Sequence, residues 1–306
     1  MILVTGGKGF IGRSVCSVLS AHGKQVVALD RKGLSGSADK RPYLSVECDI
    51  EDKNHVERIF QQYSFTAVVH LASLLRTASQ EDPLAATRVN IGGSLNMLEA
   101  VRTFGVPRMI YGSSISVYGS KSEWGWNAIS ETELAAPEDV YGETKRVVEV
   151  LGEAYRQRFG VEFMALRISS VVGPGAASPS SPWRSDLFEY LGLPHRVAVS
   201  IPYRSDEALP LVHVEDVADM FERLIDTELA SSAIYNAPSE TWTLHELART
   251  VEALDPNIRI GFGPSHVSGI PRVINGRRFV TEFGYTPMPL KEHLEHAFRL
   301  RKVNSG

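Results

Sequence analysis

Residues 1–12 read MILVTGGKGFIG, and this stretch decides the fold. The apolar run at its start predicts a buried strand, the glycines at positions 6, 7, 9 and 12 predict a tight turn, and a helical pattern follows from about Ile11. Glycines permit such a turn and let backbone N–H groups approach a pyrophosphate, whose charge is also favoured at a helix N-terminus. The stretch therefore predicts the strand, turn and helix of a dinucleotide-binding site.

The rest of the first half repeats this alternation of short apolar runs and helical patterns. Further strands are predicted at residues 25–30, 43–50, 66–72 and 107–114. Residues 82–105 and 138–160 have apolar residues at three- and four-residue spacing, and each closes on a glycine, so each predicts one long helix. Strands that alternate with helices predict an α/β fold of the Rossmann type, a doubly wound parallel sheet.

The texture changes after residue 170, where GPGAASPSSPWRSD (173–186) is rich in Gly, Pro and Ser. Residues 211–226 and 232–237 again resemble a helix and a strand that return to the first sheet. Thr243 and Glu246 form a capping box for a helix, and a last helix is predicted at 291–300. We expect an NAD-binding domain of residues 1–168 plus about 211–236, and a smaller α+β substrate domain of about 169–210 plus 237–306.

Composition excludes several classes of protein. The chain has 32 Lys and Arg against 36 Asp and Glu, without the basic excess that nucleic-acid binding requires. No apolar run approaches the roughly 18 residues of a membrane span, and no charged segment precedes an apolar one at the start. We therefore expect a cytoplasmic protein with no nucleic-acid or membrane partner. Cys16 and Cys48 lack the spacing of metal ligands or disulfides, so we expect reduced structural thiols and no metal.

Asp30 indicates which dinucleotide is bound. It ends the predicted strand at 25–30, eighteen residues after Gly12. A carboxylate there accepts hydrogen bonds from the adenosine ribose hydroxyls and repels a 2′-phosphate, which favours NAD over NADP. Arg31 and Lys32, the neighbouring cations, favour the opposite choice because they could bind that phosphate. We predict NAD as the cofactor.

Several marks along the chain resemble one known family, the extended short-chain dehydrogenases, also called the NAD-dependent epimerase/dehydratase family. Its T-G-x-x-G-F-I-G motif is matched at residues 5–12, and its later motifs follow in order at 49–50, 70–72 and 90. The resemblance covers nearly the whole chain. It implies that Asp49 and Ile50 hold the adenine and that Leu71, Ala72 and Ser73 line the cofactor site. The cofactor-binding set is then Gly6, Gly9, Phe10, Ile11, Gly12, Asp30, Arg31, Asp49, Ile50, Leu71, Ala72, Ser73, Asn90, Tyr141 and Lys145.

Tyr141 and Lys145 are the candidate catalytic pair. Four residues apart, they lie on one face of a helix. They follow a segment, residues 111–119, that resembles the S-x-x-V-Y-G element of the family, with Ser114 at the place of the catalytic Ser or Thr. Three elements in the same order and spacing predict a Ser, Tyr and Lys mechanism.

The chemistry explains these residue types. Oxidation of an alcohol needs a base for the O–H proton, but a free phenol with a pKa of about 10 is only about 0.1% ionised at pH 7. Lowering that pKa by about three units needs roughly 4 kcal/mol, which a lysine ammonium one turn away and a positive nicotinamide ring supply. Tyr141 is thus the predicted general acid and base, Lys145 its tuning group, and Ser114 the donor to the substrate oxygen.

The substrate is less well determined. Ile115 and Ser116 replace the acidic pair that follows the catalytic Ser or Thr in the family's dehydratases, which disfavours dehydration. The arginines with which nucleotide-sugar members usually bind diphosphate are missing from their places, and the possible replacements are Arg184, Arg204, Arg272, Arg277 and Arg278. Residues 70–83, 113–119 and 208–217 resemble the threonine dehydrogenase branch, although Ala176, Ala177, Ser178 and Pro179 replace its glycine-rich substrate loop.

We therefore predict NAD-dependent hydride transfer at a secondary alcohol of a sugar-like substrate: a sugar, a sugar acid or a nucleotide sugar. The alternatives are a UDP-hexose 4-epimerase with unusual diphosphate contacts, a dehydrogenase of a small hydroxy acid and, last, a non-catalytic NAD sensor. Trp124, Trp126 and Trp183 are aromatic residues that could stack on a sugar, or be plain core residues. The helices near 84–103 and 140–159 resemble the family's dimer-forming pair, so we expect a homodimer. The candidate substrate residues are Ser73, Ser116, Ser170 and Trp183.

Overall fold

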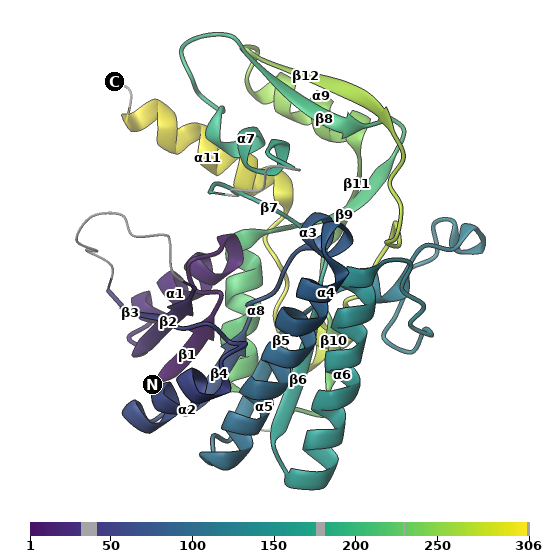
Figure 1. Cartoon of the computed structure of the whole chain (residues 1–306). Helices are drawn as coiled ribbons and strands as arrows, with labels where there is room; N and C mark the ends of the chain where they lie inside the picture. Colours follow the sequence, from purple (N-terminus) through teal and green to yellow (C-terminus); the bar gives the residue numbers. More distant parts are fainter. Residues whose placement is uncertain (32–41, 176–180, 229, 305–306) are drawn as a thin grey trace.

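The computed structural model describes residues 1–31, 42–175, 181–228 and 230–304. Its centre is a seven-stranded sheet in which every neighbouring pair is parallel (Figure 1). The strand order is β10-β6-β5-β4-β1-β2-β3. The order reverses at β1, where a parallel α/β sheet has its ligand crevice. The strands are β1 Ile2–Thr5, β2 Val26–Asp30, β3 Leu44–Glu47, β4 Ala67–His70, β5 Arg108–Ser114, β6 Glu162–Ile168 and β10 Ile234–Asn236.

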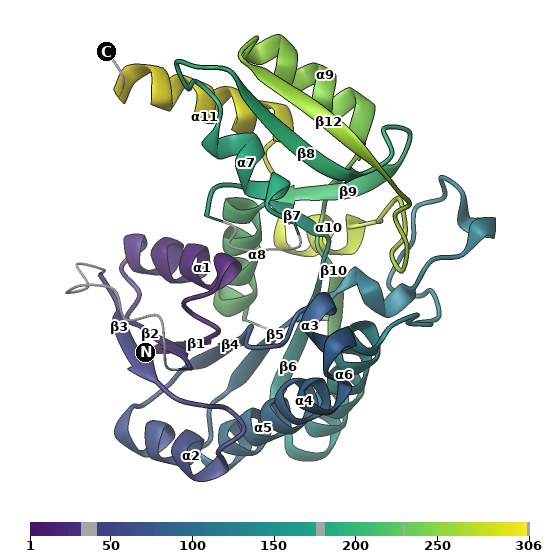
Figure 2. The same ribbon diagram turned by 45° about the horizontal axis from the view of Figure 1, so that its top comes forward.

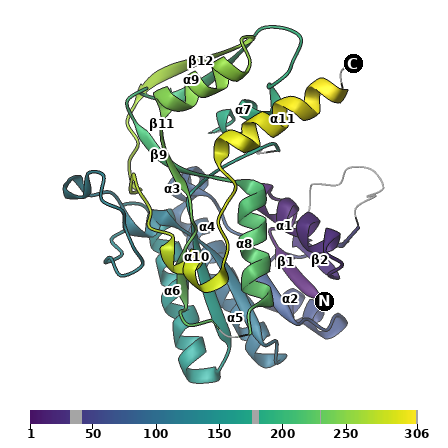
Figure 3. The same cartoon turned by 180° about the vertical axis from the view of Figure 1, so that it is seen from behind.

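Helices cover both faces of this sheet, as the sequence predicts for a doubly wound fold. One face packs against α1 (Phe10–Ala21), α8 (Val214–Asp226) and α10 (Arg277–Phe283), which Figure 3 shows in front of the strands. The other face packs against α2 (Lys53–Gln62), α5 (Ser94–Thr103) and α6 (Val140–Phe159). The buried Phe279 of α10 belongs to the core of this sheet, although it comes late in the chain, in the segment assigned from sequence to the substrate domain.

A smaller α+β unit lies over the carboxyl edge of the main sheet (Figures 1 and 2). Two small sheets form it, with strand orders β11-β9-β7 and β12-β8. Thr243 and Glu246 form the capping box that the sequence predicts for α9. The elements are β7 Ser170–Val172, α7 Trp183–Glu189, β8 Val197–Tyr203, β9 Ala208–His213, β11 Glu240–Thr243, α9 Leu244–Leu254, β12 Ile258–Ser265 and α11 Leu290–Asn304.

The segment 82–105 differs from the single helix that its periodicity predicts. After α3 (Arg76–Glu81), the chain forms α4 (Pro83–Ala86), a π-helix η1 (Thr87–Gly93) and then α5. The wider π turn turns the buried Asn90 inward, where it bonds to the backbone of Leu74. At Gly93, a Cβ atom would lie 2.6 Å from the Ile50 side chain, so any larger residue there would have to displace Ile50.

Two expectations drawn from composition can be compared with the structure. Cys16 and Cys48 are both buried, and neither is part of a disulfide. Among the described residues, no helix is both long enough and apolar enough to cross a membrane.

Candidate active site at the carboxyl edge of the sheet

The glycine turn between β1 and α1 forms a cradle of bare backbone. Gly6 has a φ of +67°, and a Cβ atom there would lie 2.9 Å from the backbone N of Ala72. At Gly12, a Cβ atom would lie 2.1 Å from the carbonyl oxygen of Gly6. Gly9 caps α1 without a side chain, and the first turn of α1 has no acidic residue. The N-terminal N–H groups of α1 thus suit an anion such as a pyrophosphate.

Asp30 ends β2 beside this turn. Its carboxylate accepts hydrogen bonds from the backbone N–H groups of Lys8 (3.0 Å) and Arg31 (2.8 Å). These bonds fix the carboxylate at the edge of the turn, where a ribose would lie in a dinucleotide site. Arg31 is exposed, and Lys32 lies outside the described residues.

Three hydroxyl and imidazole groups beneath the turn form a buried chain that the sequence reasoning missed. Thr5 Oγ1 lies 2.6 Å from His70 Nδ1, and His70 Nε2 lies 2.9 Å from Ser94 Oγ. Thr5 Oγ1 also accepts from the backbone N–H groups of Leu71 and Ala72 at 3.2 Å. This chain ties β1, β4 and α5 together. The signal for it is a polar residue at the carboxyl end of each of two apolar strands.

The remaining predicted cofactor residues lie along the same edge. Ile50 is buried, and Asp49 accepts a hydrogen bond from the backbone of Glu51 (3.0 Å). Leu71, Ala72 and Ser73 follow β4 and are half-buried. Asn90 links Leu74 to α6 by donating to Thr144 Oγ1 (3.0 Å). The predicted cofactor residues therefore follow one another along the carboxyl edge of the sheet, from the glycine turn to the start of α6.

Lys145 is buried beneath the start of this helix, with 2% of its surface exposed. Its Nζ donates to the carbonyl oxygen of Gly112 (2.7 Å) and to Ser73 Oγ (3.3 Å), and it lies 5.4 Å from the centre of the Tyr141 ring. Burial lowers the pKa of Lys145 to about 7, while the charge of Glu149 acts in the opposite direction. The structure thus places the predicted lysine beside the predicted tyrosine, held by β5 and by the residue after β4.

Tyr141 and Ser114 are brought together by a close backbone approach. A Cβ atom at Gly142 would lie 2.6 Å from the carbonyl oxygen of Ser116, in the 3-10 helix η2 (Ile115–Tyr118). Asp139 caps α6 by accepting from the backbone N–H of Gly142 (2.8 Å) and pairs with Arg76 (2.5 Å). Ser114 Oγ accepts from Ser116 N (3.1 Å), and Ser114 lies close enough to Tyr141 to lower the pKa of that phenol. The three predicted catalytic residues are therefore neighbours.

The pKa of Tyr141 differs from the sequence-based expectation. Burial raises this pKa to about 12, and the charge of Asp139 adds to the rise, while the Ser114 hydrogen bond and the charge of Arg184 oppose it. The expected lowering is thus absent from the protein alone, because the desolvation of the phenolate outweighs these two opposing effects. In this state Tyr141 is a protonated donor at neutral pH.

Glu149 and Arg167 form an ion pair below Lys145, which the sequence reasoning also missed. Both are 3% exposed, and Arg167 donates to Glu149 at 2.9 and 2.7 Å. Ser113 Oγ donates to the same carboxylate at 2.6 Å. The four-residue spacing of Tyr141, Lys145 and Glu149 on α6 was the available signal, since it puts all three on one helix face.

The candidate substrate residues differ in their placement. Ser116 (6% exposed) contacts Ser114, and Ser73 contacts Lys145, so both belong to the catalytic group. Ser170 is buried in β7. Trp183 is 0% exposed and packs in the core of the smaller unit, so its ring presents no face to a sugar; this corrects the stacking role considered from sequence. Trp126 is exposed and Trp124 half-buried.

The five arginines considered as replacements for the missing diphosphate-binding arginines lie in different surroundings. Arg204 pairs with Asp206 (2.8 Å) on the surface, and Arg278 bonds to Ser232, Ile234 and Glu131. Arg272 and Arg277 are exposed. Of these five, Arg184 is the one whose charge affects the pKa of Tyr141.

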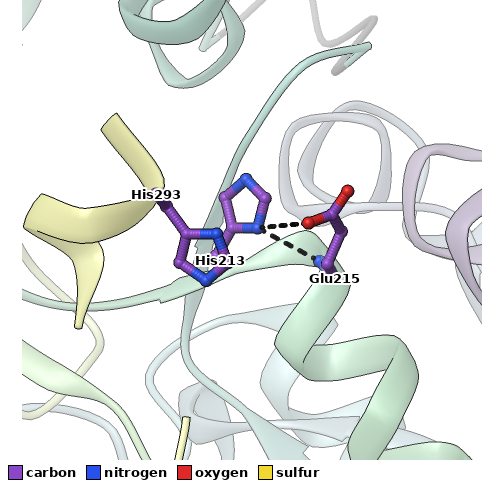
Figure 4. Close-up of side chains that lie close together, drawn as sticks. All are labelled: His213, Glu215 and His293. Atoms are coloured by element: carbon purple, nitrogen blue, oxygen red, sulfur yellow. Dashed lines mark hydrogen bonds and ion pairs between the residues drawn. The ribbon is translucent and has the colours of Figure 1, made fainter. Parts of the chain in front are cut away.

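One group of side chains in the described part of the chain has the composition of a metal site. His213, Glu215 and His293 have ligand atoms within 4.8 Å of one another (Figure 4). The two imidazole rings stack at 3.7 Å, His293 Nε2 bonds to Asp216 (2.7 Å), and His213 Nδ1 accepts from Glu215 N (3.4 Å). Stacked rings direct their nitrogen lone pairs side by side, not toward one point, so the cluster joins α11 to the start of α8 through hydrogen bonds.

The structure also has a cavity of about 560 Å³ at the opposite edge of the sheet, lined by Met1, Thr66, Pro107 and Asp226 among others. It lies at the amino ends of the strands, whereas ligands of parallel α/β sheets bind at the carboxyl ends. We therefore place the candidate active site at Tyr141 and not in this cavity.

Comparison with known proteins places this geometry in a family. The family model for the NAD-dependent epimerase/dehydratase family matches residues 2–237. A UDP-glucose 4-epimerase of Lacticaseibacillus casei is 32% identical over 175 residues, which are 56% of this chain and 52% of that protein. The matched region thus spans about half the length of that curated relative.

Solved structures match over nearly the whole chain. The UDP-glucose 4-epimerase of Thermus thermophilus, in complex with NAD, has a TM-score of 0.79 at 26% identity and covers 97% of this chain and 98% of its own. The L-threonine dehydrogenase of Phytophthora infestans has a TM-score of 0.86 at 25% identity, with 98% of each chain covered. By its sequence match, fold and arrangement of site residues, this chain belongs to the NAD-dependent epimerase/dehydratase family, whose enzymes use NAD.

Proposed function

We propose that this protein transfers a hydride between NAD and a secondary alcohol of a sugar-like substrate, with Ser114, Tyr141 and Lys145 as the catalytic groups. The observation that carries the proposal is the buried Lys145, held by Gly112 and Ser73 with its ammonium 5.4 Å from the Tyr141 ring. A buried lysine without a buried carboxylate in direct contact is costly, and such perturbed groups cluster at functional sites.

Each of the three residues has a distinct role in the proposal. Ser114 donates to the substrate oxygen, and Tyr141, protonated at neutral pH, gives its proton to that oxygen when a carbonyl is reduced. When bound, NAD supplies the hydride acceptor and a positive ring that favours the phenolate. Lys145 adds a second cation beside the phenol, so Tyr141 accepts the alcohol proton in the oxidising direction.

The predicted cofactor residues fit NAD. A side chain at Gly12 would collide with the backbone of Gly6, so the tight turn that brings bare backbone toward a pyrophosphate requires glycine there. Asp30, held by the backbone N–H of Lys8, is our candidate for the adenosine ribose contact. We propose Asp49, Ile50, Leu71, Ala72 and Asn90 as further contacts. We also propose the two-domain division drawn from the sequence, except that α10 belongs with the main sheet.

The substrate is the open part of the proposal, because the related proteins divide between nucleotide sugars and L-threonine. A panel of free sugars, sugar acids, UDP-hexoses and small hydroxy acids separates the possibilities when both absorbance at 340 nm and products are followed. We expect net NADH from a dehydrogenase substrate. Interconversion of UDP-hexoses without net NADH would favour a UDP-hexose 4-epimerase, and binding of NAD without turnover of any member would favour a sensor.

We also propose a homodimer built from α4, α5 and α6. These adjacent helices expose apolar side chains, including Leu84 (66% exposed), Leu95 (37%) and Val150 (58%). Val150→Glu places a charge in this surface, and we expect light scattering to change from dimer to monomer mass. Leu300→Glu, at an exposed leucine of α11, is the matched control and should leave the mass unchanged. A monomeric wild-type protein would contradict the proposal.

A further inference from the structure

Arg184 is a cation that the described protein leaves without a hydrogen-bond acceptor. It lies in the first turn of α7, and its Nε is buried with no hydrogen-bond partner. Its backbone is fixed, since its N–H donates to Ser181 O (3.3 Å) and its carbonyl accepts from Gly173 N (3.0 Å). Within the described residues, its side chain forms no ion pair either.

Other arginines that are withdrawn from solvent behave differently. Arg167 pairs with Glu149 at 2.7 Å and Arg108 with Glu162 at 2.6 Å. This is the normal arrangement, because an unpaired buried charge is expensive. Among the residues that the structure describes, Arg184 differs from these arginines because no carboxylate pairs with its side chain. A negatively charged substrate group could supply the missing partner.

The surroundings of Arg184 locate it in the active site. Burial lowers the pKa of Arg184, and the phenols of Tyr203 and Tyr141, which lie near enough to act on its charge, oppose this fall. Arg184 in turn is one of the groups that counteract the raised pKa of Tyr141. The guanidinium carbon lies 5.6 Å from the centre of the buried Trp183 ring, which supports it from the core side.

We infer that Arg184 binds a carboxylate of the substrate and holds it near the alcohol that faces Tyr141. This inference rests on the proposed hydride transfer at Tyr141. A planar guanidinium matches a carboxylate with two parallel hydrogen bonds, and one such cation balances one carboxylate. A diphosphate carries about two charges and needs further cations. Lys145, the buried cation beside Tyr141, is already bonded to Gly112 and Ser73. The substrate class is therefore an acid: a sugar acid or a hydroxy acid.

The test uses probes that differ only in the acid group. D-glucuronate is compared with D-glucose, UDP-glucuronate with UDP-glucose, and UDP is added alone, each with the NAD-loaded full chain. Binding is measured by calorimetry and turnover by product analysis. The variants are Arg184→Met, which keeps an unbranched side chain, and Arg184→Lys, which keeps the charge but loses the planar fork. Arg204→Met is the matched control, because Arg204 pairs with Asp206 on the surface. Circular dichroism and NAD affinity check that each variant is folded.

We expect the wild type and Arg204→Met to bind the acid of at least one pair more tightly than its neutral partner, and Arg184→Met to lose that preference by about 10- to 100-fold. Arg184→Lys should recover part of it. Equal binding of acid and neutral probes by the wild type, or an unchanged preference in Arg184→Met, overturns the inference. Loss of UDP binding in Arg184→Met without an acid preference also overturns it, in favour of a diphosphate contact. If an acid binds through Arg184 but is never converted, the carboxylate contact is supported and only the proposed reaction is contradicted.

Discussion

One face of α6 carries Tyr141, Lys145 and Glu149 at four-residue spacing, of which the first two are the proposed catalytic pair. Tyr141 is nearest the site, Lys145 lies below it, and Glu149 lies below Lys145 in the Arg167 ion pair. The charge of Glu149 counteracts the loss of a proton that burial favours at Lys145. Glu149 is thus a positioning residue that acts on Tyr141 through the lysine.

Glu149→Gln tests this role. Removing the carboxylate takes away the group that raises the pKa of Lys145, so this pKa falls further below about 7 and the ammonium is lost at lower pH. We expect the high-pH side of the kcat/KM profile to move to lower pH by about one unit. The profile is measured with a substrate found in the panel.

A second variant separates this electrostatic effect from damage to the fold. Glu149→Gln alone leaves the charge of Arg167 buried without its counter-charge, which costs up to about 3–5 kcal/mol. Glu149→Gln with Arg167→Met removes the unpaired cation and should restore stability while keeping the shifted profile. A wild-type profile in this double variant would contradict the role of Glu149.

The sequence predicted the proposed catalytic residues but not the charges that surround them. Ser114, Tyr141 and Lys145 stand at recognisable spacings, whereas the partner of Arg167 or the lack of one for Arg184 depends on which distant segments meet. Arg184 was therefore one of five equivalent candidates in the sequence. The pKa of Tyr141 was also unpredictable, because the spacing of Tyr and Lys says nothing about desolvation.

At the scale of elements, the site depends on the close contact between α6 and η2. A Cβ atom at Gly142 would lie 2.6 Å from the carbonyl oxygen of Ser116. Because this oxygen belongs to the backbone, a change of side-chain rotamer cannot relieve the clash. The contact is what brings the first turn of α6 against the residues after Ser114.

We therefore expect Gly142→Ala to push α6 away from η2. The extra methyl should lower kcat by about tenfold or more, because small displacements of catalytic groups are costly, and should destabilise the fold by about 1–3 kcal/mol. Gly261→Ala is the control, since the place of its Cβ has no heavy atom within 4 Å. Equal kinetics for the two variants, measured with the same substrate, would show that the contact does not position Tyr141.

The strands and crossover helices were predictable because the apolar residues of each follow one dominant spacing along the sequence. The π-helix η1 was not, since its residues keep the apolar spacing of an ordinary helix and the wider turn arises from contacts with Ile50 and Leu74. The available signal was Asn90 within an otherwise apolar helix face, followed by Gly92 and Gly93.

For the whole molecule, two buried histidines make stability depend on pH. Burial lowers the pKa of His70 to about 3, with the charge of Lys145 as the second cause, and burial followed by the charge of His293 lowers the pKa of His213 to about 3. Unfolding returns each imidazole to a pKa of about 6.5. The unfolded chain then binds more protons between these values, so stability is complete above about pH 6.5 and falls as the pH decreases toward 3.

We expect the free energy of unfolding to drop between pH 7 and 5.5 by about 1 kcal/mol for each histidine. His213→Asn keeps a side chain that can cap α8 but does not titrate, so the drop should be smaller by about 1 kcal/mol. Urea unfolding at both pH values measures this. The same drop in wild type and variant would show that His213 is not held neutral in the folded protein.

The most direct test of the proposed mechanism is the turnover of Tyr141→Phe with a substrate that the wild type converts. The variant keeps the ring and loses only the hydroxyl that exchanges the proton. We predict that kcat falls by about a thousandfold or more, while the affinity for NAD, measured by calorimetry on the same preparation, stays within a few fold of wild type. A Tyr141→Phe protein that turns over at the wild-type rate would contradict the assignment of Ser114, Tyr141 and Lys145 as the catalytic groups.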